Sequence, residues 1–268
     1  MQKLKHFAFR SNIKVIILVF VVLNAISFSY EAWANKHHTH AKKTTAVVTH
    51  TEKTTEVVTH TADATDVTKK KRIVELVHKT IDNLNYSAYK MGGTKFDISK
   101  GVYIVDCSSF VDHLLERVNP HAYSSLVNSS GSDTPNTRNY YNFINGLADG
   151  HSHYWNKIEG VGELQAGDIL VFRKKNSESA PGHIMVVMNK PVRHPGSFVV
   201  QVADSAPVGH SHDTRSRHVS GIGIGTLSLK VNPRTGHPFA YAWREGSFWK
   251  NNVHFAMARP IDRLHDKK

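Results

Sequence analysis

The sequence predicts an α+β domain in which N-terminal helices pack on an antiparallel sheet. Apolar residues recur at helical spacing between residues 73 and 84 and again between 110 and 118. Short apolar runs at 183–188 and 197–204 follow, separated by a loop, and this pattern is typical of neighbouring antiparallel strands. We therefore expect the helices to come first and the sheet to follow.

The first 34 residues are expected to be an export signal. Basic residues precede an apolar run from Val15 to Leu23, and the segment closes on Ala32-Trp33-Ala34, which fits a signal-peptidase site before Asn35. An uncleaved membrane anchor is the alternative, but a span needs about 20 predominantly apolar residues, and Asn24 interrupts the run. We expect a periplasmic or secreted protein with no stable membrane insertion after cleavage.

Residues 35–69 are predicted to be a linker, because they are rich in Thr, His and Lys and poor in large apolar side chains. The segment Thr44–Thr51 recurs in slightly changed form as Thr54–Thr61, but two copies are too few for a solenoid core. Residues 70–268 have the length of one globular domain. We therefore expect a signal peptide, a linker and one domain.

The net positive charge of the chain indicates which class of partner it can attract. The chain carries 34 Lys and Arg against 22 Asp and Glu, a formal net charge of +12, so a polyanionic surface could attract it. Aromatic residues do not alternate with the basic ones, and no nucleic-acid-binding module is present. We expect no nucleic-acid partner. Among polyanions, anionic cell-wall polymers or lipid headgroups are the partners that we expect.

The chain contains one cysteine, Cys107, so it has no internal disulfide. Exported domains usually use cysteines in pairs, and a lone thiol there indicates either chemistry or a small buried apolar side chain. Asp106-Cys107-Ser108 stands directly before the apolar pattern that starts at Phe110, so Cys107 is predicted in the first turn of a helix. Unpaired N–H groups at a helix N-terminus favour a thiolate and could stabilise an oxyanion.

A cysteine nucleophile needs a base, which is normally a histidine oriented by a third group. Of the 19 histidines, His183 is the candidate because it opens the apolar strand pattern. If Met188 lies opposite Ser197 in a hairpin, Asp204 becomes a diagonal neighbour of His183 on the same face. Gln201 then points to the other face, although a slip of one residue would exchange these two candidates.

Four blocks give the domain a resemblance to the NlpC-type branch of the papain-like cysteine peptidases, which act on bacterial cell walls. The blocks are Tyr89–Gly93, Asp106–Val111, Leu164–Phe172 and Gly182–Val187. The resemblance implies that Cys107 is the nucleophile, His183 the base and Asp204 the third polar residue. It also implies that Tyr89, Asp106 and Ser108 help to bind the substrate or its oxyanion.

The same resemblance implies a function: hydrolysis of an amide bond in peptidoglycan stem peptides through a thioester acyl-enzyme, by a monomer without a cofactor. The match departs from the usual family pattern at Ser109, where Gly is common, in a long loop from Thr94 to Tyr103, and at Asp204, where His is commoner. None of these departures removes a catalytic group.

Two other functions stay open. A zinc-dependent amidase could use His151-Ser152-His153 and His210-Ser211-His212 with Asp213, although no helical His-Glu-x-x-His motif accompanies them. A non-catalytic wall-binding module is the third hypothesis. Glycines at 221, 223 and 225 lack the context of a nucleotide-binding loop and are interpreted as structural, and Asp168 is interpreted as a turn residue. Residues 119–159 are interpreted as an insertion whose aromatic side chains either line the active-site cleft or belong to the core.

Overall fold

The structure, a computed structural model, describes residues 61–175 and 182–261. The predicted export signal, 1–34, and residues 35–60 of the predicted linker lie outside the described residues. Helix α1 (Thr61–Asp82) begins inside the segment 35–69, so the boundary expected at residue 70 falls within a helix. A helix can extend beyond its apolar stripe, because each residue added to existing turns gains a backbone hydrogen bond and no new helix nucleus has to form.

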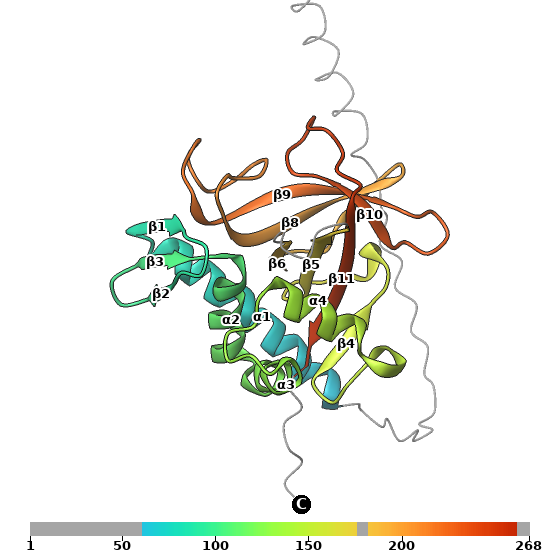
Figure 1. Ribbon diagram of the computed structural model, residues 1–268, viewed down its shortest axis with the longest axis horizontal. Coiled ribbons are helices and arrows are strands. Elements are labelled where there is room, and N and C mark those ends of the chain that lie inside the picture. Colours follow the sequence, from blue (N-terminus) through green and yellow to red (C-terminus); the bar gives the residue numbers. More distant parts are fainter. Residues whose placement is uncertain (1–60, 176–181, 262–268) are drawn as a thin grey trace, which may run out of the picture. The chain divides into compact units, whose positions relative to one another are not determined.

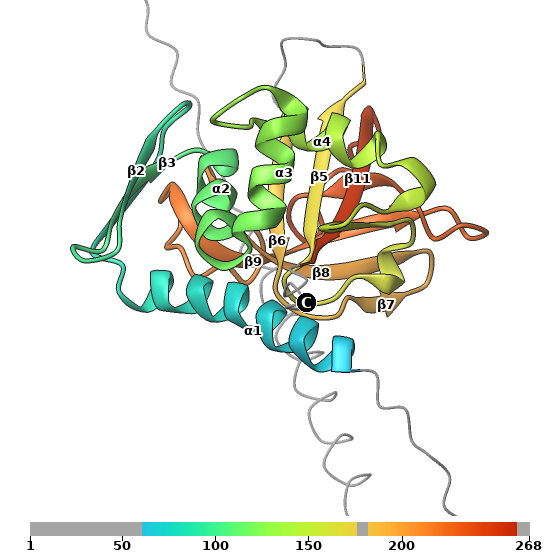
Figure 2. The same ribbon diagram turned by 90° about the horizontal axis from the view of Figure 1, so that it is seen from below.

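The helices lie together on one side of the molecule (Figures 1 and 2). After α1, the described chain forms α2 (Cys107–Val118), α3 (Pro120–Ser130), α4 (Thr137–Asn145) and the 3-10 turns η2 (Ala148–Gly150) and η3 (Val161–Glu163). Helices α1 and α2 form where the two apolar patterns predicted helices. The helices of the predicted insertion, α3 and α4, pack beside α2 and on the sheet.

The main sheet contains β4 (Trp155–Ile158), β5 (Ile169–Lys174), β6 (His183–Val187), β7 (Val192–His194), β8 (Ser197–Ala206), β9 (Gly221–Val231), β10 (Pro238–Ala242) and β11 (Val253–Pro260). Its order is β10-β9-β8-β6-β5-β11-β4, with β7 paired to β8, and every pair of neighbours is antiparallel. The predicted α+β class, with helices packed on an antiparallel sheet, is confirmed.

A second, three-stranded sheet was not expected. Strands β1 (Tyr86–Tyr89), β2 (Thr94–Asp97) and β3 (Val102–Val105) pair in the order β1-β3-β2, with β1 parallel to β3. The short apolar run at 102–105 is a strand, and the polar segment that starts at Thr94, expected to be part of a long loop, is a strand as well. Phe96 explains the difference, because its ring packs 4.8 Å from that of Tyr103 and anchors β2 on the core.

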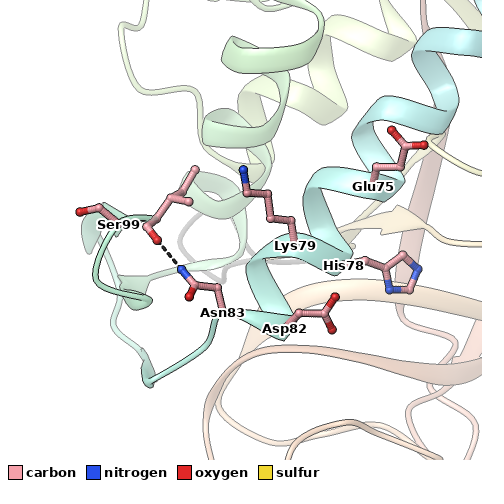
Figure 3. Close-up of a pocket in the computed structure, with 7 residues that line it drawn as sticks. Glu75, His78, Lys79, Asp82, Asn83 and Ser99 are labelled. Atoms are coloured by element: carbon pink, nitrogen blue, oxygen red, sulfur yellow. Dashed lines mark hydrogen bonds between the residues drawn. The ribbon is translucent and has the colours of Figure 1, made fainter.

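A surface hollow of about 720 Å³ lies between α1 and the turn after β2 (Figure 3). His78, Lys79 and Asp82 of α1 line it, and the amide of Asn83 donates a hydrogen bond to the backbone oxygen of Ile98 across its end. Cys107 is not among the residues that line this hollow. The candidate nucleophile therefore lies outside this hollow.

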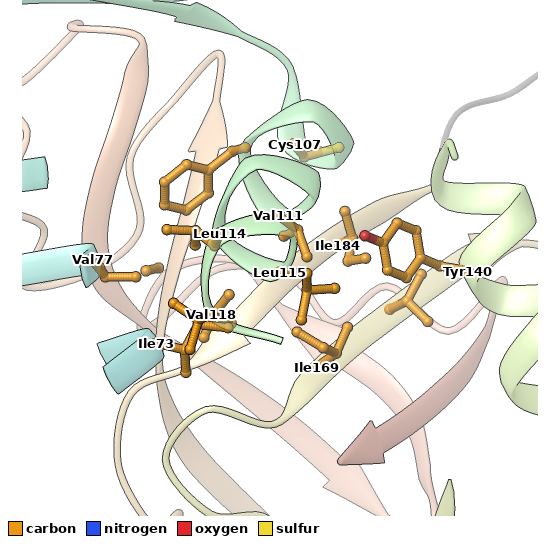
Figure 4. Packing of buried hydrophobic residues seen from close by; sticks show 14 of the residues in the cluster. Ile73, Val77, Cys107, Val111, Leu114, Leu115, Val118, Tyr140, Ile169 and Ile184 are labelled. Carbon is orange, nitrogen blue, oxygen red and sulfur yellow. The ribbon is translucent and has the colours of Figure 1, made fainter. Parts of the chain in front are cut away.

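The helical layer and the sheet enclose the first apolar core. Figure 4 shows Val111, Leu114 and Leu115 of α2 between residues of α1 on one side and Ile184 of β6 on the other. These three α2 side chains are fully buried. At about 25 cal/mol per Å² of apolar surface, packing of this kind dominates the stability of the fold and fixes the position of α2.

The opposite face of the sheet holds a second apolar core. Along β6, Ile184 and Val186 face the helices, while Met185 and Val187 face this second core. The sheet curls until β10 contacts β11, so its inner face is closed to solvent although no α-helix in the described chain belongs to this core. This curl explains why every residue of β6 is buried.

The pairing of β6 with β8 differs from the predicted register. Met188 donates its N–H to the carbonyl of Gln201, and not to a residue opposite it near Ser197, so the pairing is displaced four residues along β8. The reason is β7, which forms within the expected loop and pairs with the first part of β8. An even displacement keeps every side chain on its predicted face, so the predicted orientation of Asp204 is unaffected.

None of the helices in the described part of the chain is long and apolar enough to cross a membrane.

Asp112 links the Cys107-bearing helix to α4 and should make stability depend on pH. Its buried carboxyl accepts a 2.6 Å hydrogen bond from the Tyr140 hydroxyl. Burial, opposed by that bond, raises the pKa of Asp112 from 3.8 to about 8. The folded state therefore binds this proton more tightly than the unfolded state, and its stabilising effect is lost as the pH rises through about 8.

We expect Asp112→Asn to remove this dependence. Between about pH 4 and pH 8, the wild-type unfolding free energy should carry a decrease of up to about 1.4 kcal/mol per pH unit that the variant lacks. Urea unfolding at several pH values measures the difference, with Glu159→Gln, an exposed carboxylate that is not among the groups acting on Asp112, as the control. Parallel curves for wild type and Asp112→Asn would show that Asp112 titrates normally.

Candidate active site

Cys107 is the first residue of α2, as predicted. Asp106 is the N-cap: its backbone is extended, its carbonyl accepts from Phe110 N, and its side chain accepts from Ser109 N at 2.8 Å. The N–H groups of Cys107 and Ser108 then have no acceptor within the helix, because such partners begin only after the first turn. The thiol therefore lies in the field of a helix N-terminus, next to two candidate oxyanion donors.

Asp106 and Ser108 have structural partners. The Ser108 hydroxyl donates to Asp106 Oδ1 at 2.9 Å, and Gly92 N donates to Asp106 Oδ2 at 2.8 Å. The Asp106 carboxylate thus joins the turn after β1 to the start of α2. Substrate contact by these two side chains stays a prediction, while their observed bonds position the backbone of Cys107.

His183 connects Cys107 to Asp204. Its Nε2 lies 2.6 Å from Asp204 Oδ2, and Cys107 is close enough to act on the pKa of His183. Because Nε2 is engaged by Asp204, Nδ1 is the ring nitrogen left to exchange a proton with the sulfur. The predicted pairing of His183 with Asp204 is confirmed, whereas Gln201 accepts a hydrogen bond from Asn189 on the other side of the strand.

The electrostatics favour a charged pair. Burial alone lowers the pKa of His183, but the negative charge of Cys107 and the bonds to Asp204 and Cys107 raise it to about 10. His183 therefore keeps its proton at neutral pH, beside a sulfur that lies at a helix N-terminus.

Asp204 is fully buried and accepts from three side chains. Oδ2 receives Nε2 of His183 and, at 2.9 Å, Nε2 of His210, while Oδ1 receives Nη2 of Arg215 at 2.8 Å. Burial raises the pKa of Asp204, but the positive charges of His210 and His183 and their hydrogen bonds hold it well below its usual range. The carboxylate is therefore ionised at neutral pH.

The loop 207–220, between β8 and β9, supplies partners that the sequence did not identify as part of the site. Arg215 bonds Asp213 through Nε and Nη2 at 2.8 and 2.7 Å, and its Nη1 donates to the carbonyl of Gly221. His210 and Asp213 belong to the His-Ser-His-Asp motif, which on sequence alone indicated a candidate zinc site. The alternating glycines at 221, 223 and 225 were a second sequence signal that could have indicated the close packing of this loop.

Trp243 covers both histidines. Its ring centroid lies 5.0 Å from that of His183, in an edge arrangement, and 3.9 Å from that of His210. The indole N–H donates to the carbonyls of Val208 and Gly209, which fixes the ring over the site. An apolar plane here keeps water from the imidazoles and strengthens their interaction with Asp204. Nothing in the sequence pattern indicated this position.

Tyr89 and Thr137 each bring a hydroxyl group to the site. Burial, followed by the charges of Cys107, Asp106 and Asp204, raises the pKa of Tyr89 to about 12, so its phenol stays a neutral donor, and its hydroxyl lies 3.9 Å from Met91 Sδ. Thr137 Oγ1, at the start of α4, is 3.7 Å from Cys107 Sγ. The insertion therefore reaches the site through Thr137, whereas its aromatic residues Tyr140 and Trp155 are buried in the core.

The histidine motifs and Asp168 do not form a metal site in the described residues. In the described residues, no group of three or more His, Cys, Asp or Glu is arranged to hold a metal ion. His210 points to Asp204, while the side chain of His212 is exposed. Asp168 accepts from Gln165 N at the turn before β5, as expected of a turn residue, and also binds Arg259.

The described chain is thus an α+β protein with a cysteine at a helix N-terminus and a histidine–aspartate pair on the adjoining sheet. No family model matches the chain, and no solved structure matches it. It is similar to an uncharacterized protein of Acanthamoeba polyphaga mimivirus, with 27% identity over 190 residues that cover 61% of this chain and 81% of the viral protein.

Proposed function

We propose that this protein is a cysteine hydrolase of the NlpC-type, papain-like kind, and that Cys107, His183 and Asp204 carry out its chemistry. The observation that carries the proposal is the 2.6 Å bond between His183 and Asp204, with Cys107 at the N-terminus of α2 close enough to shift the pKa of His183. The resemblance of four sequence blocks to that family supports it further.

In the proposed reaction, the Cys107 thiolate attacks an amide carbonyl and forms a tetrahedral oxyanion. The N–H groups at the start of α2 and the neutral Tyr89 hydroxyl are the donors available to this oxyanion. His183 then gives its proton to the leaving amine as the C–N bond breaks, leaving a thioester. Neutral His183 next takes a proton from water, whose attack on the thioester releases the carboxylic acid and restores Cys107.

Asp204 orients His183 throughout this cycle. Its bond to Nε2 holds Nδ1 toward the sulfur, and its charge stabilises the imidazolium that protonates the leaving group. The proposed substrate is a peptidoglycan stem peptide, cleaved at an amide next to a D-glutamyl or diaminopimelyl residue, and the proposed site of action is the periplasm or the cell exterior. The protein is proposed to act as a monomer.

Digestion of purified peptidoglycan by the full-length protein tests this proposal. Mass spectrometry should reveal new fragments in which one stem-peptide amide has gained a water. Cys107→Ser, which keeps the shape of the side chain but cannot form a thiolate, should release none of them. Unchanged peptidoglycan with the wild type, under conditions where Cys107 reacts with a thiol reagent, would contradict the proposed substrate.

A further inference from the structure

We propose that His210 and Arg215 are positioning residues of the Cys107 site, which hold the Asp204 carboxylate so that its Oδ2 faces His183. This inference rests on the proposed cysteine chemistry. It assigns a role to the loop 207–220, and with it to the His-Ser-His-Asp and alternating-glycine motifs that the triad leaves unexplained.

The bonds of His210 indicate that it is an imidazolium. Its Nε2 lies 2.9 Å from Asp204 Oδ2, and its Nδ1 lies 3.3 Å from the carbonyl oxygen of Trp243. Both partners are acceptors, so both nitrogens must donate, and only the doubly protonated ring can do so. The His210 side chain is fully buried, which makes this an internal positive charge.

The ion-paired charges around Asp204 balance in the reactive state. The Cys107 thiolate, Asp204 and Asp213 are negative, and His183, His210 and Arg215 are positive. The nearby Asp106 carboxylate lies outside this set, because N–H and O–H donors hold it. Buried charges are tolerated when each is paired and hydrogen-bonded. Removal of His210 or Arg215 leaves an uncompensated negative charge beside the place where the Cys107 thiolate forms.

Geometry then couples these cations to the nucleophile. Asp204 Oδ2 bonds both His183 and His210, while Oδ1 is held by Arg215, so both carboxylate oxygens are fixed. Arg215 is fixed in turn by Asp213 and the Gly221 carbonyl. Without these partners the carboxylate can rotate about its bond to Cβ, and the orientation of His183 is lost.

Two glycines make room for the arrangement. Gly223 of β9 pairs with Asp204 of β8, and a Cβ at Gly223 would lie 2.4 Å from Arg215 Nε. A Cβ at Gly225 would lie 2.7 Å from Asp213 Oδ2 and 2.8 Å from His210 Cβ. Both spacings are too short for real contacts. The alternation of glycines on this face of β9 therefore lets the loop lie directly on the sheet.

Alkylation of Cys107 by iodoacetamide tests the inference without a substrate. Cys107 is the only cysteine, so intact mass reports the reaction of this thiol alone. We expect His210→Asn, whose side chain is too short to reach Asp204, to slow alkylation at pH 7 by about tenfold and to move the acid limb of the rate profile to higher pH. His210→Gln keeps a donor of similar reach and should restore much of the rate.

The loop offers matched controls. His212 and Arg217 are exposed, so His212→Asn and Arg217→Ala should alkylate at the wild-type rate. Arg215→Lys keeps the charge but cannot bond Asp204, Asp213 and Gly221 together, and we expect it to be slowed like His210→Asn. Thermal melts accompany each rate, so that unfolded variants are recognised.

Wild-type alkylation profiles in folded His210→Asn and Arg215→Lys would overturn the inference, even if peptidoglycan cleavage were confirmed. The expected profiles with no peptidoglycan cleavage would support the positioning role and reject only the substrate. Should the variants unfold, ¹⁵N NMR of the wild-type histidines decides: both His210 ring nitrogens should carry protons at pH 7. A neutral His210 would contradict the charge balance on which the inference depends.

Discussion

Cys107→Ser is expected to lower kcat for amide hydrolysis by on the order of 10⁴-fold or more, while EDTA leaves wild-type turnover unchanged. The serine hydroxyl is not ionised beside His183, so the attack that forms the acyl-enzyme is lost, although the side chain still fits between Asp106 and Thr137. Because the serine side chain has the same shape as the cysteine side chain and is slightly smaller, the thermal melt should change little. Rates on stem-peptide substrates with and without chelator measure both effects.

The same experiment separates thiol chemistry from the zinc alternative. A metal hydrolase built on His151-Ser152-His153 and His210-Ser211-His212 would lose activity in EDTA and regain it with Zn²⁺. Cys107→Ser would then retain much of its rate. That result would reject Cys107 as the nucleophile and favour a zinc site built on the His-x-His motifs.

The helix position of Cys107 and the contact of His183 with Asp204 could be predicted from the sequence, because local patterns determine both. Cys107 directly precedes an apolar helical repeat, and the alternation along 183–188 and 197–204 determines which face each side chain takes. The predicted register was wrong by four residues, since β7 could not be foreseen in a short polar loop. The pairing of His183 with Asp204 survived because strand faces depend only on odd or even displacement.

The rest of the site depends on contacts between distant segments. His210 and Arg215 reach Asp204 only because the loop 207–220 folds back on the glycines of β9, and Trp243 covers the histidines from the end of β10. The periodicity of a single sequence does not indicate that a loop folds back onto a neighbouring strand. The three-stranded sheet was missed for a related reason, because β2 is short and polar and is held by the packing of Phe96 on Tyr103.

Asp204→Ala should lower kcat by on the order of a hundredfold or more, with a smaller effect on KM. The Asp204 carboxylate orients His183 and stabilises its protonated form, and both contributions act on the chemical step. Gln201→Ala should turn over nearly as wild type, since Gln201 bonds Asn189 on the other face of β8 and touches neither His183 nor Cys107. A dead Gln201→Ala beside an active Asp204→Ala would reverse the assignment of the third residue.

The pH profile gives a readout of Asp204 that a loss of stability would not imitate. With the pKa of His183 raised to about 10, wild-type kcat/KM should stay high through neutral pH and fall as the pH rises through about 10, where the imidazolium loses its proton. Removing the negative charge of Asp204 leaves the effect of burial, which lowers the pKa of His183, less opposed. The alkaline limb should therefore move to lower pH in Asp204→Ala and in the nearly isosteric Asp204→Asn, which serves if the smaller side chain unfolds the protein. An alkaline limb that stays near pH 10 in both folded variants would show that Asp204 does not stabilise the imidazolium.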